Sequence, residues 1–156
     1  MSLQAINEND IQAFVQAIGG FFESLSETQS LNIQTAFLAE QDQEVNISDF
    51  TGVIKVAGRF KGSIWFSAPR PMLRKVLMYL NEPALTDENF MDAAGEIANI
   101  FAGNARRHFG ESLEISPPEL HMGLPTMNAS HRARPFVIVV SWERYKAYLI
   151  VDVARA

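Results

Sequence analysis

The sequence predicts an α+β domain in which a mostly antiparallel six-stranded sheet is covered by two long helices. Three observations lead to this fold class: two long stretches of helical hydrophobic spacing, strand-like segments joined mainly by short turns, and the order helix, strand, hairpin occurring twice. Strands that follow one another through hairpins pair antiparallel. The repeated order indicates an internal pseudo-repeat, although the two halves share few identical residues.

The first copy opens with residues 8–27, which predict an amphipathic helix. Its apolar side chains recur at intervals of three and four residues, and Asn9 or Asp10 is placed to cap its start. Residues 31–39 then alternate between apolar and polar side chains, as is typical of a strand. Residues 50–68 follow, and their glycine-containing turn predicts a hairpin.

A short helix and a much longer one separate the two copies of this order. Pro71 suits the first turn of the short helix, which runs to about Leu80. Thr86 or Asp87 caps the long helix, which opens the second copy, and Gly110 ends it.

The rest of the second copy predicts a short strand at 113–115, a loop over 116–135, and a hairpin formed by 136–142 and 145–153. No segment has the composition of an interdomain linker, so residues 1–156 are expected to form a single domain. An open antiparallel sheet has two edges, and pairing one of them across a two-fold axis would bury it. We therefore expect a homodimer.

Composition narrows the classes of function. The 156-residue chain has 13 Lys and Arg against 18 Asp and Glu, a formal net charge of −5, which argues against a nucleic-acid partner. It has no cysteine, which excludes a thiol nucleophile and thiolate-bound metals. No signal-peptide pattern is present, and the longest strongly apolar run, residues 136–140, is far shorter than the roughly 20 residues of a membrane span. We expect a cytoplasmic protein without a membrane partner.

The strongest functional signal lies in the long helix. Asp92, Glu96 and Asn99 are spaced i, i+4 and i+7, so they stack on one side, opposite the apolar side chains. Gly95 and Gly103 lie one turn before and one turn after Asn99. Since an interior glycine destabilises a helix by about 1 kcal/mol relative to alanine, the pair indicates that another backbone or another protein approaches closely there.

Spacing alone leaves other interpretations open. The three polar residues are also what any solvent-exposed helix face shows, and the glycines could equally be packing notches against a sheet or a second helix. Arg106 near the helix end complements the helix dipole and is a candidate for meeting an acidic partner. His108, His121 and His131 have no metal-ligand spacing, so no metal site is expected.

The segment from Asp92 to Asn104, D-A-A-G-E-I-A-N-I-F-A-G-N, resembles the signature helix of the CheC/CheX family of chemotaxis phosphatases. That signature is an Asp or Ser, three residues, Glu, two residues, Asn, and a Gly-Asn pair one turn later. The predicted order of elements is similar to that family's over nearly the whole chain. In the family a proline follows the next short strand, and Pro117 and Pro118 are its nearest candidates here.

CheC-type members carry the Glu-x-x-Asn pair on both long helices. Here Phe14 and Ala17 stand at the corresponding places of the first helix, after Asp10. A second site is therefore absent, and the chain is most similar to the single-site CheX branch.

The resemblance implies a phosphatase that hydrolyses the aspartyl phosphate of a CheY-like response regulator. Asn99 would orient the attacking water, because a carboxamide both donates and accepts hydrogen bonds without itself being a nucleophile. Glu96 would pair with a lysine beside the phosphoryl group. The resemblance also implies a homodimer and no cofactor of its own, the regulator supplying Mg²⁺. The residues that would contact the partner are Asp92, Gly95, Gly103 and Arg106.

Two alternatives remain. The chain could be a non-catalytic interaction module of the same fold that binds a regulator or another signalling protein. It could also be a small-molecule enzyme, which would require a deep pocket near Glu96.

Overall fold

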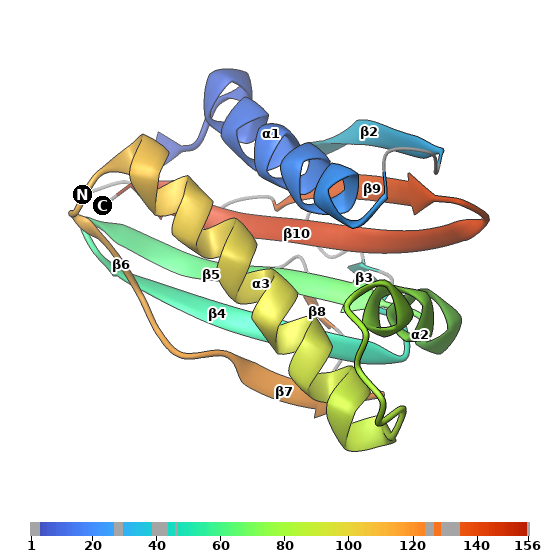
Figure 1. Cartoon of the computed structure of the whole chain (residues 1–156). Helices are drawn as coiled ribbons and strands as arrows, with labels where there is room; N and C mark the ends of the chain where they lie inside the picture. Colours follow the sequence, from blue (N-terminus) through green and yellow to red (C-terminus); the bar gives the residue numbers. More distant parts are fainter. Residues whose placement is uncertain are drawn as a thin grey trace.

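The structure is a computed structural model that describes residues 4–26, 30–38, 44–45, 47–123, 127–128 and 135–155. Two long helices cover an antiparallel sheet, as the sequence predicts, and the short helix between them packs on the same face (Figure 1). The helices are α1 (Glu8–Leu25), α2 (Arg70–Tyr79) and α3 (Asp87–Phe109). The strands of the main sheet are β1 (Gln4–Ala5), β2 (Leu31–Leu38), β4 (Phe50–Gly58), β5 (Phe60–Ala68), β6 (Leu113–Ile115), β7 (Glu119–Met122), β9 (Phe136–Trp142) and β10 (Tyr145–Arg155). Strands β3 (Glu44–Val45) and β8 (Met127–Asn128) pair with each other separately.

The main path of the sheet runs β2-β9-β10-β5-β4-β6, and every pairing along it is antiparallel. If β2, β4 and β5 are exchanged with β6, β9 and β10 respectively, the same strand order results, read from the opposite edge of the sheet. The fold therefore carries the pseudo-repeat as an interleaved arrangement, in which β2 pairs with the second hairpin and β6 pairs with the first.

The six predicted strands are present, and two short strands extend the sheet beyond the prediction. β1 pairs with β10, and β7, which lies in the segment predicted to be a loop, pairs with β4. Most of the residues of β7 are exposed, so the alternation that marks a half-buried strand is missing there.

The start of α1 also differs from the prediction. Asn7, rather than Asn9 or Asp10, is the N-cap: its side chain accepts a hydrogen bond from the backbone N–H of Asp10 at 2.9 Å. The carboxylate of Asp10 accepts in return from the backbone N–H of Asn7 at 2.9 Å, which completes a capping box.

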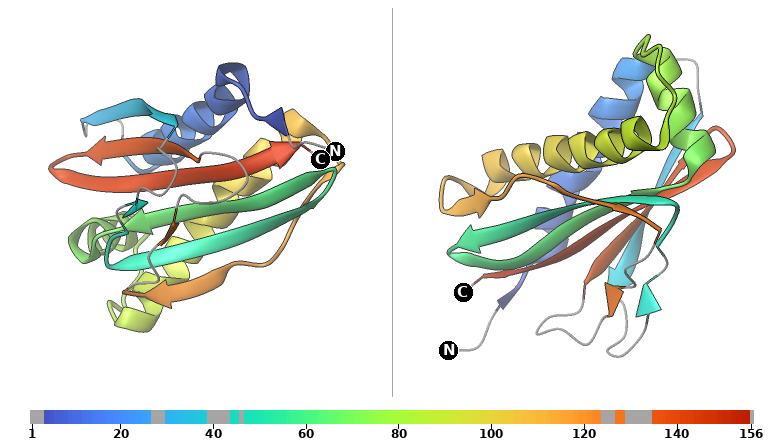
Figure 2. Two further views of the ribbon diagram at one scale, coloured as in Figure 1. Left: turned by 180° about the vertical axis from the view of Figure 1, so that it is seen from behind. Right: turned by 90° about the horizontal axis from the view of Figure 1, so that it is seen from below.

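Seen along the edge of the sheet in Figure 2 (right), the three helices lie on one face and the β3–β8 pair on the other. Helix α3 lies across β4 and β5, and α1 packs beside α3 over β2 and β9 (Figure 1). The core between helices and sheet is rich in aromatic rings. Its fully buried aromatic side chains are Phe14, Phe22, Phe50, Phe66, Phe101 and Trp142.

Candidate functional site

The candidate site lies on α3, whose first turn is tied to its neighbours. Thr86 caps the helix through its side-chain oxygen. Arg70, at the start of α2, forms an ion pair with Asp87, and this hydrogen bond raises the pKa of Arg70. The guanidinium also lies over the rings of Phe50 and Phe90, 5.0 and 5.5 Å from their centroids. These contacts fix where α3 begins relative to α2 and β4.

Two glycines allow α3 to lie directly on the sheet. A Cβ on Gly52 of β4 would lie 2.6 Å from the Cα of Gly95 and 2.7 Å from the carbonyl oxygen of Ala94. The backbones of β4 and α3 are therefore in direct contact where they cross, and any residue larger than glycine at position 52 would push α3 away from the sheet. The crossing sets which face of α3 points outward.

The three polar residues of the motif lie on that outward face. Asp92 and Glu96 are exposed, and Asn99 is half-buried. Within the described part of the chain, none of their side chains has a hydrogen-bond or ion-pair partner. A carboxylate and a carboxamide that lie one turn apart on a rigid helix are thus available to another molecule.

The two glycines beside Asn99 have different surroundings. A Cβ on Gly103 would meet nothing within 4 Å, so that side of Asn99 is open. Gly95 is buried, and a Cβ there would lie 2.2 Å from Cδ2 of Leu120 and 3.3 Å from Cβ of Pro118. The expectation that Gly95 contacts a partner is corrected accordingly: the chain's own β4 and β7 segments fill its surroundings, as in the packing alternative.

Arg106 lies two turns beyond Asn99 on the same side of α3. Its Nε donates a hydrogen bond to the carbonyl oxygen of Leu113 at 3.1 Å, which ties the end of α3 to β6. The residue remains exposed, and its terminal N–H groups have no hydrogen-bond or ion-pair partner among the described residues.

A groove of about 450 Å³ adjoins Glu96 and lies between α3, α2 and the end of α1. Asp92 and Glu96 line it together with Glu82 and Asn89. It is an open groove rather than the deep pocket that a small-molecule enzyme would need. No sequence pattern predicted it, because its walls come from three separate helices. Its apolar lining consists of Phe21, Val76, Leu77, Leu80, Ala93, Ile97 and Ile100.

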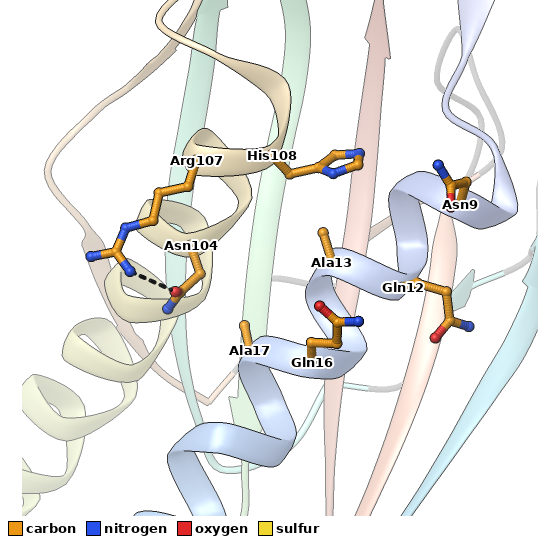
Figure 3. A pocket seen from close by; sticks show the side chains of 8 residues that line it. All are labelled: Asn9, Gln12, Ala13, Gln16, Ala17, Asn104, Arg107 and His108. Carbon is orange, nitrogen blue, oxygen red and sulfur yellow. Dashed lines mark hydrogen bonds between the residues drawn. The ribbon is translucent and has the colours of Figure 1, made fainter.

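A second groove, of about 420 Å³, separates the C-terminal half of α3 from α1 (Figure 3). Its lining is rich in side-chain amides and contains no carboxylate. Ala17, which stands where a second site would have its Asn, lines this groove, while Phe14, in the place of the Glu, is fully buried. The complete lining is Asn9, Gln12, Ala13, Gln16, Ala17, Asn104, Arg107 and His108.

A buried ionic network joins α1, α3 and β10. Asp10, only 3% exposed, accepts hydrogen bonds from Nη1 and Nη2 of Arg155 at 3.0 and 3.2 Å, and its Oδ1 lies 3.0 Å from Nε2 of His108. Burial is the largest influence and raises the pKa of Asp10, but the hydrogen bonds from Arg155, Asn7 and His108 together outweigh it and lower the pKa to about 2. The partners of Asp10 lie 98 and 145 residues away, so no local sequence pattern predicts this network.

Across the described ranges, no group of three or more His, Asp or Glu side chains is arranged to hold a metal ion. None of the described helices has the length and apolar character of a membrane span.

A family profile described as chemotaxis phosphatase CheX matches residues 50–141, which include the whole of α3. The chain is also similar in fold to the chemotaxis protein CheX from Desulfovibrio desulfuricans, with a TM-score of 0.76 and 16% identity over 95% of this chain and 99% of that one. A CheC-like chemotactic protein from Shewanella oneidensis MR-1 matches with a TM-score of 0.70 and 21% identity over 95% of this chain and 99% of that one.

A third similar structure is a CheX–CheY–BeF₃–Mg²⁺ complex from Borrelia burgdorferi. It matches with a TM-score of 0.66 and 20% identity over 94% of this chain and 97% of that one. No curated protein sequence matches the chain. At these identities the structural likeness establishes the fold.

Proposed function

Because the chain belongs to the family of the chemotaxis phosphatase CheX, we propose that it accelerates hydrolysis of the aspartyl phosphate of a CheY-like response regulator. The observation that carries this proposal is the pair Glu96 and Asn99 on the outward face of α3. Neither side chain has a polar partner within the described residues. The open position at Gly103 leaves room beside Asn99 for the surface of a second protein.

Asn99 orients the water that attacks phosphorus. In the reaction the water oxygen forms a bond to phosphorus, the bond between phosphorus and the aspartyl oxygen breaks, and aspartate and inorganic phosphate leave. Such transfer needs positioning and electrostatic stabilisation more than proton removal. The carboxamide oxygen accepts a hydrogen bond from the water. This hydrogen bond holds a lone pair of the water oxygen in line with the bond that breaks.

Glu96 brings Asn99 into register. Its carboxylate, one helical turn from Asn99, accepts a charge-assisted hydrogen bond from a lysine that neutralises the phosphoryl group on the regulator. Asp92, exposed one turn earlier, extends the acidic surface, and the free N–H groups of Arg106 supply a cation at the other end of the same face. The regulator therefore meets a row of charges with the amide at its centre.

The phosphoryl group and its Mg²⁺ would arrive with the regulator. In the Borrelia burgdorferi structure CheX and CheY are together with BeF₃ and Mg²⁺, and BeF₃ has the shape and charge of a phosphoryl group. The described acidic residues of this chain do not group into a set of metal ligands. Glu96 and Asn99 accordingly act on the lysine and the water.

We also propose that the protein is a homodimer. Strand β2 ends the main path of the sheet, so its outer edge can pair with the same strand of a second copy across a two-fold axis. Light scattering at tens of micromolar should give the mass of two chains. A monomer at that concentration would remove this part of the proposal.

The decisive experiment compares Asn99→Ala with Asn104→Ala. Asn104 is a second half-buried asparagine of α3, but it lies in the groove facing α1, off the motif face. A phosphorylated CheY-like regulator is mixed with each protein, and loss of the phosphoryl group is followed. Asn99→Ala should lower the rate by about 100-fold or more, and Asn104→Ala should act like the unmodified protein.

Two results would count against the proposal. Hydrolysis by Asn99→Ala at the unmodified rate would overturn the assigned mechanism. An unmodified protein that binds the phosphorylated regulator without accelerating loss of phosphate would instead identify a non-catalytic interaction module.

A further inference from the structure

Exposed apolar side chains gather next to the motif helix. Leu80, directly after α2, is 55% exposed, and Leu85, just before α3, is 37% exposed. Large side chains that face water in a cluster mark surfaces that bind other proteins. This cluster borders the groove between α2 and α3, because Leu80 lines that groove.

The groove combines an apolar interior with acidic edges. Val76, Leu77 and Ile97 are buried and form its inner wall. The charged side chains that line it are all carboxylates, those of Glu82, Asp92 and Glu96. This combination suits an aliphatic or aromatic side chain that is flanked on its own protein by lysine or arginine.

The position of the groove ties it to the phosphatase site. Glu96 belongs to both, and Asn99 lies three residues, about 4.5 Å along the helix axis, from Glu96. A protein that brings its phosphoryl group to Asn99 and a lysine to Glu96 therefore also contacts one wall of the groove.

We propose that the groove between α2 and α3 anchors an apolar side chain of the response regulator, one flanked by basic residues near the phosphorylation site. This inference rests on the proposed function and names the surface that selects the regulator. The apolar anchor supplies affinity, because it removes Leu80 and its own surface from water. The carboxylates supply selectivity and a faster encounter with a basic surface.

The test compares Leu80→Ser with Met78→Ser. Met78 is 54% exposed on α2 and Leu80 is 55% exposed directly after it, so neither change should disturb folding, but only Leu80 lines the groove. Binding is titrated with the CheY-like regulator activated by beryllofluoride, which allows no turnover. Leu80→Ser should raise Kd about tenfold, and Met78→Ser should leave it unchanged. With phosphorylated regulator, Leu80→Ser should raise KM and keep kcat.

Glu82→Gln tests the acidic edge. The substituted amide keeps an oxygen that can accept the hydrogen bond that Glu82 now receives from the backbone of Ala84. It should raise Kd about two- to threefold and weaken the dependence of binding on salt.

The inference is overturned if Leu80→Ser binds as tightly as the unmodified protein, or if Met78→Ser weakens binding as much. This result is distinct from a failure of the proposed function. Binding to the beryllofluoride-activated regulator requires no hydrolysis, so a protein that binds through the groove without phosphatase activity would refute only the catalytic proposal.

Discussion

The two long helices carry an aspartate at the same place of the pseudo-repeat, in opposite environments. Asp10 of α1 is 3% exposed and ion-paired with Arg155. Asp92 of α3 is exposed and has no partner within the described residues. Four residues farther along each helix, Phe14 is fully buried whereas Glu96 faces solvent.

The difference shows that a helix offers a site only when its rotation about its own axis turns the motif outward. In α3 the buried apolar side chains and Gly95, which contacts Gly52, lie against the sheet. Asp92, Glu96 and Asn99 lie on the remaining side of the helix. In α1 the first two positions of the same spacing, Asp10 and Phe14, are buried, while Ala17 lines a groove, so the absence of a second Glu-x-x-Asn pair follows from the packing at position 14 as well as from the residues.

The largest expected effect comes from Phe14→Glu, which places the glutamate of the Glu-x-x-Asn motif in α1. The new carboxylate would lie in the core, where the ring of Phe14 now packs 6.3 Å from that of Phe109. We expect a loss of at least about 4 kcal/mol in the free energy of unfolding, measured by urea denaturation. Adding Ala17→Asn completes the pair but should create no second phosphatase site.

Ala17→Asn alone is the matched control, because Ala17 is half-buried and lines an open groove. It should change the free energy of unfolding by no more than about 1 kcal/mol. A folded double variant with two active sites would show that burial of position 14 does not prevent a second site.

The next largest effect is the difference in stability loss between Asp10→Ala and Asp92→Ala. Asp10→Ala leaves the guanidinium of Arg155 without its partner and removes half of the capping box, so we expect a loss of about 3 kcal/mol. The side chain of Arg155 is 37% exposed, which keeps the loss at the lower end for a broken buried pair. Asp92→Ala should change stability by no more than about 0.5 kcal/mol. Equal losses in thermal or urea unfolding would refute the contrast.

Lowering the pH should remove the contribution that ionised Asp10 makes to stability. The folded pKa of Asp10 is about 2 against an ordinary value of 3.8, so its contribution is fully present above about pH 4 and is lost as pH falls toward 2. The gap corresponds to about 2.5 kcal/mol. Subtracting the unfolding free energy of Asp10→Asn, measured at each pH, isolates this contribution. A difference that stays constant from pH 5 to pH 2 would show that Asp10 is not held as an ion.

The motif face was predictable because its information is local. The spacing of Asp92, Glu96 and Asn99 determines that they share one side of a helix, and the hydrophobic pattern determines that this side lies opposite the core. The hairpins and the long helix were predictable for the same reason. By contrast, β7 is a strand because it pairs with β4, and its own sequence shows no strand pattern.

Contacts between distant segments could not be predicted. Nothing around Gly95 in the sequence distinguishes a notch for Leu120 from a space for a partner, and only the crossing with β4 and β7 decides between them. The ion pairs of Asp10 and the groove beside Glu96 likewise depend on residues brought together from α1, α2, α3 and β10. Each of these features is evident only once the elements are placed in the fold.

The smallest expected effect concerns the open side of the motif helix. Gly103 in α3 and Gly20 in α1 are both interior helical glycines at which a Cβ would meet nothing within 4 Å. Alanine at either position should stabilise the protein by about 0.5–1 kcal/mol, because alanine loses less backbone freedom in a helix. The two substitutions should therefore raise the melting temperature alike.

Their effects on activity should differ, because only Gly103 lies one turn from Asn99. A methyl group there stands where the proposed regulator surface must approach, so Gly103→Ala should lower kcat/KM for phosphorylated regulator while Gly20→Ala leaves it unchanged. If both variants keep full activity, the regulator does not use the open side of Asn99, and the glycine in α3 has no more functional meaning than the one in α1. A loss confined to Gly103→Ala would mean that α3 accepts a less stable helix in order to keep its catalytic face clear.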